Sequence, residues 1–487
     1  MTSQWSARVR AIGPVWVAFV GSLLLSWTAL RGTLLNRDAI YYVEAARSML
    51  DQGAGTSALR FDWQFLSILM AGLSALTGLS PETAGHLLNA FFLAGACSLL
   101  VAITRNRLPE AAWAACLVVL AMPAYNGYRN ELLREYGFWF FCMLAFWLAM
   151  RWEDSHRWRE ALACQLALAA AALFRLEAVA FYPALMLWQA FAAPAGQRLR
   201  RILMIGCLPL AGAVLAGLLV GSGLVVPPNR VVYYLEAANP LHKLRFLSEA
   251  AGRMTESVLS KYSREEAAYI LFFGLLSIIP VKFIKMAGVL IVPLGYAFAR
   301  QPVRAVLSRW QPLPWSFLAY LLVLVAFVTH QFFLVGRYVS LLNLLAVPLA
   351  AAGLALLMQR FPRWKGVMVA LALVTMAANV VSLSPKKTHI IEAGRWLGAN
   401  LQDPTRIGVD NARLAYYAGW WTTHTVILDR PALARELAQK RIDMVAVEAP
   451  HKDVEVERWL AERHLKPVQR FANKAGDAVI VAVPAQP

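Results

Sequence analysis

The sequence contains few charged residues for its size. Of its 487 residues, 16% are Asp, Glu, Lys or Arg, against about 25% in an average soluble domain. The hydrophobic fraction is 59% and the mean hydropathy is +0.51. This composition excludes a disordered chain, a collagen-like chain and a small disulfide-bonded scaffold, and it argues against one large soluble enzyme.

Sequence motifs for metals, disulfides and nucleotides are also missing. The five cysteines lie in apolar stretches without Cys-x-x-Cys spacing, and the eight histidines form no His-Glu-x-x-His pattern. There is no Asp-x-Asp pair to hold a metal against a nucleotide pyrophosphate, and no Gly-rich turn follows a predicted strand. The sequence therefore indicates neither a cofactor nor a divalent metal, and it predicts no disulfide framework.

Long apolar segments are what the sequence does contain. A helix that crosses a bilayer needs about 20 mainly apolar residues, and shorter ones occur in bundles. The first segment is too long for a signal-peptide core and precedes no cleavage pattern, so we interpret it as a retained anchor. We predict a mainly α, polytopic membrane protein with about eleven transmembrane helices. The segments cover residues 11–30, 83–104, 111–125, 136–150, 161–174, 178–193, 202–226, 286–299, 313–335, 339–358 and 366–381.

The basic residues predict the orientation of these segments. The net charge is +18, and the short loops on one side of the predicted membrane hold 16 basic but only four acidic residues. By the positive-inside rule these loops are cytoplasmic. The N-terminus is then cytoplasmic, and the tail lies outside after eleven crossings. Since most of the excess charge is a topology signal, nucleic acid is excluded as a partner.

Two long loops are predicted on the outer face, at residues 32–82 and 227–285. In the first loop, Ile40, Val43, Ala46 and Leu50 recur at helical spacing, and residues 63–79 form a second apolar helix. A Ser-Pro pair at 80–81 then begins the next helix. In the second loop, the stretch 269–280 is apolar enough to enter the membrane.

The last part of the chain, residues 384–487, differs from the preceding membrane domain, residues 1–383. Charge rises there, and short apolar strands alternate with amphipathic helices, which predicts a small C-terminal periplasmic α/β domain. We expect helices at 390–401, 431–440 and 453–463, and strands at 406–409, 426–429, 444–448 and 477–483.

Asp38 is the first candidate catalytic residue, because it follows the first span closely in an outer loop. A carboxylate at the membrane surface can take a proton from a hydroxyl nucleophile. The structural alternative is that Asp38 caps the helix that starts at Ala39. The two roles are compatible, since capping would hold the carboxylate in place.

Further charged residues lie at the outer ends of spans. Glu131 and Glu135, together with Arg129, form either a second wall of a site or a set of surface ion pairs. Arg175 and Glu177 lie deep in apolar sequence, where ionisable residues usually face a polar cavity or pair with each other.

Arg337 and Tyr338 open a late span, and the Arg337 guanidinium there can bind a phosphate through two hydrogen bonds or extend to lipid headgroups. Lys282 and Lys285 can neutralise a phosphate or act as interfacial anchors. We assign Arg60 and Tyr41, from the first outer loop, to the lining of the same cavity.

The order of these residues resembles the GT-C superfamily of integral-membrane glycosyltransferases. The nearest branch is similar to the bacterial protein O-mannosyltransferases and the lipid A aminoarabinose transferase. The resemblance covers most of the chain, and the Ala393–Leu397 and Ala415–Gly419 stretches resemble the periplasmic C-terminal domains of such enzymes. It rests on Asp38-Ala39-Ile40-Tyr41-Tyr42, Leu87-Leu88-Asn89-Ala90-Phe91, Pro123, Phe174-Arg175-Leu176-Glu177 and Arg337-Tyr338.

The resemblance implies a sugar donor carried on a polyprenyl phosphate and an inverting transfer at the periplasmic face of a bacterial inner membrane. Asp38 would activate the acceptor hydroxyl, Arg337 would stabilise the departing lipid phosphate, and Glu131 or Glu135 would match a second acidic position. The partners implied are a polyprenyl-phosphate-linked sugar, a glycolipid, glycan or protein acceptor, and membrane lipid. Many relatives have a second acid directly after the first, whereas Ala39 follows Asp38 here, which leaves the acceptor open.

Two other functions remain in view. A polytopic transporter or flippase for lipid or sugar would have related halves with broken helices, and the sequence contains no such repeat. A non-enzymatic assembly partner would use the C-terminal domain as its binding module.

Overall fold

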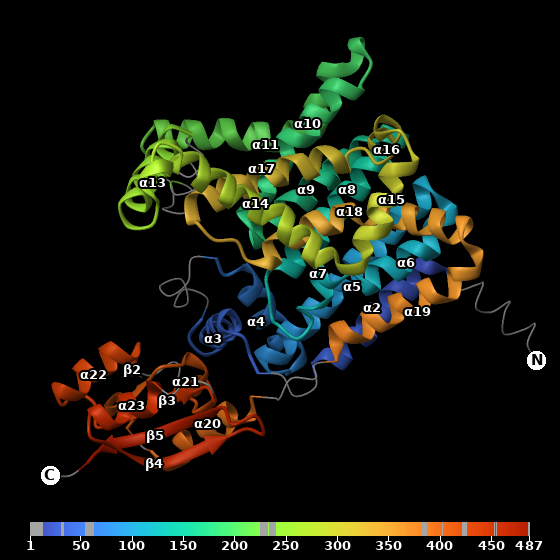
Figure 1. The fold of residues 1–487 in the computed structure, drawn as a ribbon. Coiled ribbons are helices and arrows are strands. Elements are labelled where there is room, and N and C mark those ends of the chain that lie inside the picture. Colours follow the sequence, from blue (N-terminus) through green and yellow to red (C-terminus); the bar gives the residue numbers. More distant parts are fainter. Residues whose placement is uncertain are drawn as a thin grey trace, which may run out of the picture. The chain divides into compact units, whose positions relative to one another are not determined.

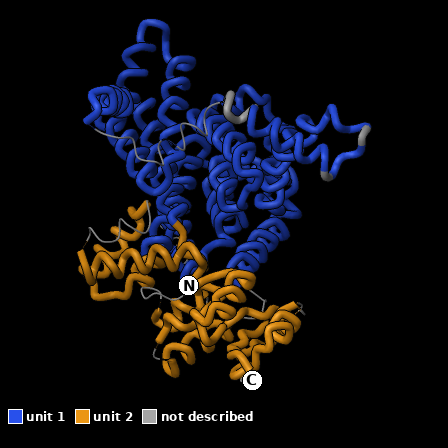
Figure 2. The backbone as a smooth tube through the Cα atoms, turned by 90° about the vertical axis from the view of Figure 1, so that its left-hand side faces the viewer, with its two compact units in different colours: residues 1–28, 87–129, 134–381 blue, residues 29–86, 130–133, 382–487 orange. Residues whose placement is uncertain are grey.

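The computed structural model describes residues 13–30, 34–53, 63–224, 232, 240–381, 387–401, 403–420, 426–451, 453 and 455–485. The chain forms two compact units, which Figure 2 colours separately. Unit 1 comprises residues 1–28, 87–129 and 134–381, and unit 2 comprises residues 29–86, 130–133 and 382–487. The first outer loop therefore belongs to the same compact unit as the C-terminal residues.

Unit 1 is helical throughout its described residues (Figure 1). Each of the eleven apolar segments expected from the sequence overlaps helical structure in the described residues, although segments 111–125, 178–193 and 286–299 are each divided among more than one helix. The longer helices are α2 (Pro14–Ala29), α5 (Pro81–Arg107), α6 (Ala112–Ala121), α8 (Glu135–Ser155), α9 (Trp158–Phe174), α10 (Phe181–Ala192), α11 (Arg198–Gly221), α13 (Pro240–Ser257), α14 (Ala267–Ala287), α15 (Ile291–Arg300), α17 (Leu313–Gln331), α18 (Gly336–Arg360) and α19 (Lys365–Val380). Shorter ones are α7 (Pro123–Asn126), α16 (Val303–Arg309) and the 3₁₀ helix η3 (Leu176–Ala180).

The length and composition of these helices identify a multi-pass membrane protein. Among the described residues, five helical stretches are long and apolar enough to cross a membrane: Pro81–Arg107, Ala195–Gly221, Ala267–Arg300, Leu313–Gln331 and Gly336–Arg360. The third differs from the expectation, because the sequence interpretation began this segment at Met286 and left α14 in the outer loop. Pro280 lies inside α14 without ending it, and a proline is tolerated in this way where neighbouring helices satisfy the freed carbonyl.

Helix α18 forms the centre of unit 1. Within its most apolar 18-residue window, 72% of the residues are buried, because α6, α14, α15 and α17 all pack against it. The absence of a side chain at Gly353 allows α15 to approach α18 closely. A Cβ atom at Gly353 would overlap the backbone carbonyl of Pro293 in α15.

We predict that Gly353→Ala destabilises the membrane unit by about 1–3 kcal/mol, because the added methyl must push two helix backbones apart. The measurement is thermal unfolding of the protein in detergent. Gly295→Ala is the matched control: it lies in α15, where an added Cβ meets no atom within 4 Å, so the substitution should raise stability slightly. Equal unfolding temperatures for the two variants would contradict this account of the packing.

In unit 2, the outer-loop helices α3 (Arg37–Gln52) and α4 (Phe65–Thr77) pack together. Ile40 and Val43 of α3 are fully buried, and Leu66 and Met70 of α4 are at most 2% exposed. Both helices were expected from their apolar spacing. The expected cap of the next helix is confirmed, because the Thr83 backbone N–H donates to Ser80 Oγ over 3.2 Å.

The C-terminal part of unit 2 contains a five-stranded sheet in the order β2-β1-β3-β5-β4. β1 is parallel to β2 and β3, whereas β5 is antiparallel to β3 and β4. The strands are β1 (Ile407–Val409), β2 (Val426–Ile427), β3 (Met444–Ala449), β4 (Leu465–Ala472) and β5 (Ala478–Pro484). The helices are α20 (Thr388–Asn400), α21 (Ala412–Tyr417), α22 (Arg430–Ala438) and α23 (Glu455–Glu462).

Side chains alternate between the two faces of this sheet, as expected for strands covered on both sides. Ala446 and Val479 point into one apolar core with α20 and α21. Val447 and Ile480 point into a second core with α22 and α23. The α/β domain expected from the sequence is therefore present, with helices on both faces.

Two elements, β4 and α21, were not predicted from the sequence. β4 is an edge strand whose residues are mostly exposed, and its polar residues and Pro467 hide the apolar alternation that identifies a strand. α21 has six residues, which is too short for helical periodicity to be recognised.

A partly buried carboxylate, that of Asp410, lies at the end of β1. Both side-chain oxygens of Asp410 accept the backbone N–H of Glu448 at 3.0 Å, and the Arg430 guanidinium is 3.9 Å away. Burial raises the pKa of Asp410 from 3.8 to about 6 despite these partners. The folded domain therefore binds a proton more tightly than the unfolded chain, and its stability falls as the pH rises between about 4 and 6.

We predict that Asp410→Asn, which mimics the protonated acid, stabilises the full-length protein relative to wild type by an amount that grows from pH 4.5 to pH 7. The gain should reach up to about 2 kcal/mol, measured by calorimetric unfolding. Asp443→Asn is the control with the opposite sign, because a hydrogen bond from Arg406 lowers the pKa of Asp443. A pH-independent effect of Asp410→Asn would contradict the raised pKa.

Candidate active site

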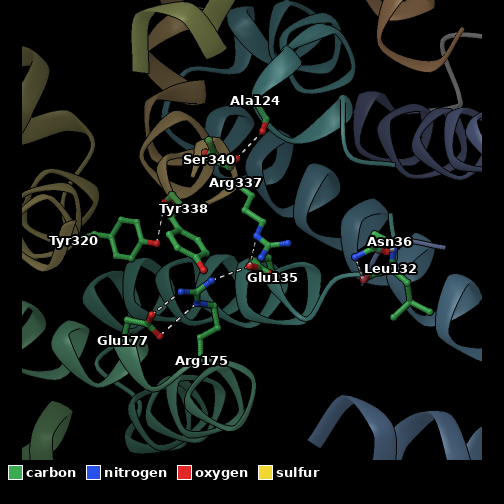
Figure 3. Close-up of polar contacts among 11 residues, drawn as sticks. Asn36, Ala124, Leu132, Glu135, Arg175, Glu177, Tyr320, Arg337, Tyr338 and Ser340 are labelled. Atoms are coloured by element: carbon green, nitrogen blue, oxygen red, sulfur yellow. Dashed lines mark hydrogen bonds and ion pairs between the residues drawn. The ribbon is translucent and has the colours of Figure 1, made fainter. Parts of the chain in front are cut away.

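The residues before Asp38 are fixed by a pair of hydrogen bonds to a second outer segment. Asn36 occupies the position before the first turn of α3. Its side chain does not cap the helix; instead its Nδ2 donates to the Leu132 carbonyl over 3.4 Å, and the Leu132 N–H donates to its Oδ1 over 3.1 Å (Figure 3). The interpretation of Asp38 as the helix cap is therefore wrong, since α3 begins at Arg37 and Asp38 lies in its first turn.

Asp38 is on the accessible side of α3. Tyr41, three residues further on and hence on the same helix face, is 46% exposed, whereas Ile40 and Val43 on the opposite side are fully buried. Asp38 itself is partly exposed. Asp38 lies in the first turn of α3, where the positive end of the helix dipole favours an acidic side chain.

Unit 1 contains a candidate site of its own, a network of ion pairs centred on Arg175. Arg175 Nη1 donates to Glu135 Oε1 over 2.8 Å, and its Nη2 donates to Glu177 Oε1 over 2.6 Å. Glu135 Oε1 also lies 3.3 Å from Arg337 Nε. Figure 3 shows Glu135 between the two guanidinium groups. The side chains of Glu135 and Arg175 are 4% and 5% exposed, and that of Arg337 is 19% exposed.

Aromatic residues complete this network. The Arg175 guanidinium carbon lies 4.4 Å from the centroid of the Tyr338 ring, within the range of a cation–π interaction. Tyr320 of α17 donates its hydroxyl to the Tyr338 carbonyl over 2.9 Å. The start of α18, the start of α8 and the η3 turn therefore meet at one polar centre inside apolar helices.

This geometry joins five residues from three separate segments of the sequence. Arg175 and Glu177 pair with each other, which was one of the two alternatives predicted from the sequence. Arg175 also pairs with Glu135. The interpretation of Glu135 as part of a surface ion pair is wrong, because its side chain is buried between two arginines. The two carboxylates and the two guanidinium groups give the network no net charge. Its members are Glu135, Arg175, Glu177, Arg337 and Tyr338.

Arg129, which the sequence placed in the cavity, holds helices together instead. Its Nε and Nη2 donate to Asn126 Oδ1, and its Nη1 and Nη2 donate to the carbonyl and hydroxyl oxygens of Ser22 and to Ser26 Oγ, at 2.6–3.0 Å. These five contacts use all five donors of a guanidinium. Arg129 therefore ties α2 to the α7 turn and has no donor left for a ligand.

The other candidate residues are distributed differently. Glu131 is half-buried in unit 2 and interacts electrostatically with Arg413. In α14, Lys282 is half-buried and Lys285 is exposed, and neither forms an ion pair with any described residue. Arg60 lies outside the described residues.

Several residues that shape the site were not assigned a role from the sequence. The Asn36 side chain forms two hydrogen bonds with the Leu132 backbone, and the Tyr320 hydroxyl forms one with the Tyr338 carbonyl. No local sequence pattern predicts such pairs. No group of three or more His, Cys, Asp or Glu side chains that could hold a metal ion occurs among the described residues.

Comparison with known proteins identifies the fold. No protein-family model and no curated protein sequence matches this chain. Among solved structures, the oligosaccharyltransferase of Archaeoglobus fulgidus aligns with a TM-score of 0.56 at 11% identity, over 95% of this chain and 72% of that one. The chain has a GT-C fold. The superfamily resemblance expected from the sequence is thus confirmed at the level of the fold.

Two further solved structures are similar to this chain. The same archaeal enzyme, tethered with an acceptor peptide containing the NVT sequon, aligns with a TM-score of 0.55 at 12% identity, over 97% of this chain and 74% of that one. ArnT from Cupriavidus metallidurans in the apo state aligns with a TM-score of 0.40 at 14% identity, over 99% and 98% of the two chains.

We predict that Glu135→Gln destabilises unit 1 by about 3 kcal/mol, because it leaves two guanidinium groups with one carboxylate in a buried site. The measurement is thermal unfolding in detergent. Glu153→Gln is the matched control: Glu153 also pairs with an arginine, Arg201, at 2.9 Å, but its side chain is 28% exposed, and such pairs contribute about 1 kcal/mol or less. Equal losses of stability in the two variants would show that burial does not strengthen the contribution of Glu135.

Proposed function

We propose that the protein is a glycosyltransferase that moves a sugar from a polyprenyl-phosphate donor to an acceptor hydroxyl at the outer face of a bacterial inner membrane. The observation that carries this proposal is the position of Arg337. It lies at the start of α18, within an ion-pair network, and the following turns of the same helix line apolar cavities.

Arg337 is suited to the donor phosphate. Its contact with Glu135 is made through Nε, and a guanidinium can keep such a contact while its two Nη groups bind phosphate oxygens. The first turn of a helix also favours an anion. Charge on the leaving phosphate grows as the bond to the sugar breaks, so an arginine placed there stabilises the transition state more than the ground state.

The lipid tail of such a donor has a matching surface in unit 1. One cavity of about 380 Å³ is bordered by Phe283, Phe317 and Leu345, among others. A second of about 480 Å³ shares Phe283 and Phe317 as walls and adds Leu342. Leu342 and Leu345 follow Arg337 by five and eight residues, or about 8 and 12 Å along a helix axis. A phosphate at Arg337 can therefore continue into an isoprenoid chain that runs along α18.

Asp38 supplies the chemistry on the acceptor side of this proposal. Its carboxylate takes the proton of the acceptor hydroxyl as the hydroxyl oxygen attacks the anomeric carbon. The bond between that carbon and the phosphate oxygen breaks on the opposite side, the polyprenyl phosphate departs with the electron pair, and the configuration inverts. General base catalysis of this kind contributes about 10²- to 10⁴-fold in rate.

The acceptor and the membrane orientation belong to the same proposal. A donor anchored in lipid suits a compartment without nucleotide sugars, which places the outer loops and the α/β domain in the periplasm. This agrees with the cytoplasmic concentration of basic loop residues. The acceptor is a glycolipid, a glycan or a protein that presents a hydroxyl.

We predict that Asp38→Asn lowers kcat by about 10²- to 10⁴-fold, because the amide cannot accept the proton. The assay measures sugar transfer by the purified protein from a panel of polyprenyl-phosphate sugars to membrane glycolipids and peptides. Asp51→Asn is the matched control, since Asp51 is an exposed residue in the last turn of the same helix. It should retain wild-type activity.

The outcomes separate the candidate functions. Transfer that requires Asp38 supports the enzyme. Full activity of Asp38→Asn removes Asp38 from the chemistry. Movement of the lipid-linked sugar between leaflets without transfer, measured in vesicles, would overturn the proposal in favour of a flippase.

A further inference from the structure

Two adjacent tyrosines of the C-terminal domain contact the outer-loop segments around Asp38. Both belong to α21, and both lie in unit 2 with the loop that they contact. The Leu35 backbone N–H donates to Tyr417 Oη over 3.1 Å. Tyr416 Oη donates to Glu82 Oε2 over 3.0 Å and accepts from Arg47 Nη2 over 3.3 Å.

The contact with Leu35 fixes the chain just before α3. Leu35 is 3% exposed, and a buried N–H needs an acceptor; the Tyr417 hydroxyl provides it. Leu34, one residue earlier, packs on the apolar core of the C-terminal domain. Since Asn36 is held by Leu132, the segment that leads into Asp38 is anchored on both sides.

The contact with Arg47 holds the same helix further along. Arg47 is nine residues after Asp38, about 14 Å along the helix axis. Its Nη1 donates to Glu44 over 3.0 Å, and its guanidinium lies 5.2 Å from the centroid of the Tyr416 ring. Burial raises the pKa of Tyr416, so its hydroxyl stays protonated and can donate to Glu82.

We propose that Tyr416 and Tyr417 are positioning residues for Asp38, so that the C-terminal domain acts in the transfer reaction by fixing the helix that carries the base. Neither tyrosine takes part in proton transfer. This inference rests on the proposed function, because it assigns the positioning of the same catalytic group.

The first test is Tyr417→Phe, which removes only the hydroxyl and keeps the ring in the apolar core. We expect kcat to fall about 5- to 100-fold. The lower value corresponds to the loss of one hydrogen bond, and the upper value to a displacement of about 1 Å at the reacting group. KM for donor and acceptor should remain unchanged. The solvent deuterium isotope effect on kcat should rise, because a misplaced base slows only the proton-transfer step, whereas a smaller fraction of folded enzyme would leave it unchanged.

The second measurement does not depend on activity. Hydrogen exchange at the Leu35 amide, and in the peptide over residues 34–40, should be faster in Tyr417→Phe than in wild type. Arg430→Lys is the matched control, because Arg430 contacts Glu448 and Asp453 in the same domain and none of its described contacts reaches the first outer loop. It should leave both the exchange rate and the isotope effect at wild-type values.

The outcomes distinguish this inference from the proposed function. If Asp38→Asn abolishes transfer but Tyr417→Phe keeps wild-type kcat and exchange rates, the positioning role is wrong and the enzyme stands. If Arg430→Lys reproduces the Tyr417→Phe effects, the domain acts only through its stability and the inference is also overturned. Should Tyr417→Phe not fold, Tyr416→Phe tests the same role through the Arg47 and Glu82 contacts. If the wild-type protein transfers no sugar, the proposed function fails first.

Discussion

A guanidinium buried among apolar helices must be paired, because an isolated charge in such surroundings is strongly unfavourable. Arg175 meets this requirement by binding Glu135 from α8 and Glu177 from its own turn. The requirement brings the start of α8 to the η3 turn, and Glu135 in turn brings in Arg337 at the start of α18. The positions of three helices therefore depend on one set of ion pairs.

A second constraint acts on the outer-loop helix α3. A short helix in a loop is marginally stable by itself, and the proposed role of Asp38 as a base requires its position to be held within a fraction of an ångström. Asn36, bound to Leu132, and Leu35, bound to Tyr417, supply that restraint from outside the helix. The grouping of the first outer loop with the C-terminal residues in one compact unit has its physical basis in such contacts.

The sequence was sufficient for features that depend on local patterns. The apolar segments predicted the helices of unit 1, and the alternation of strands and helices predicted the α/β domain. It also selected Arg175, Glu177, Arg337 and Tyr338, because charged and aromatic residues are conspicuous at the ends of apolar runs. It could not show that Glu135 pairs with Arg175, since 40 residues separate them and a glutamate in a first helical turn is usually exposed. The role of Tyr417 was hidden for the same reason, because its partner Leu35 lies 382 residues earlier.

Two arginines illustrate how the surroundings decide what a charge can do. Arg129 is surrounded by neutral oxygens that occupy all five of its donors, so an anion could bind only by breaking helix contacts. Arg337 shares the Glu135 carboxylate with Arg175, and it meets that carboxylate through Nε at 3.3 Å, whereas Arg175 is at 2.8 Å. Because the Glu135 carboxylate is shared between two guanidinium groups, it neutralises Arg337 less completely than a carboxylate paired with Arg337 alone would. In the proposed reaction the phosphodiester of the donor brings one negative charge to Arg337, and the departing phosphate monoester gains a second as the bond to the sugar breaks. Arg175 can keep Glu135 and Glu177 in place throughout these steps.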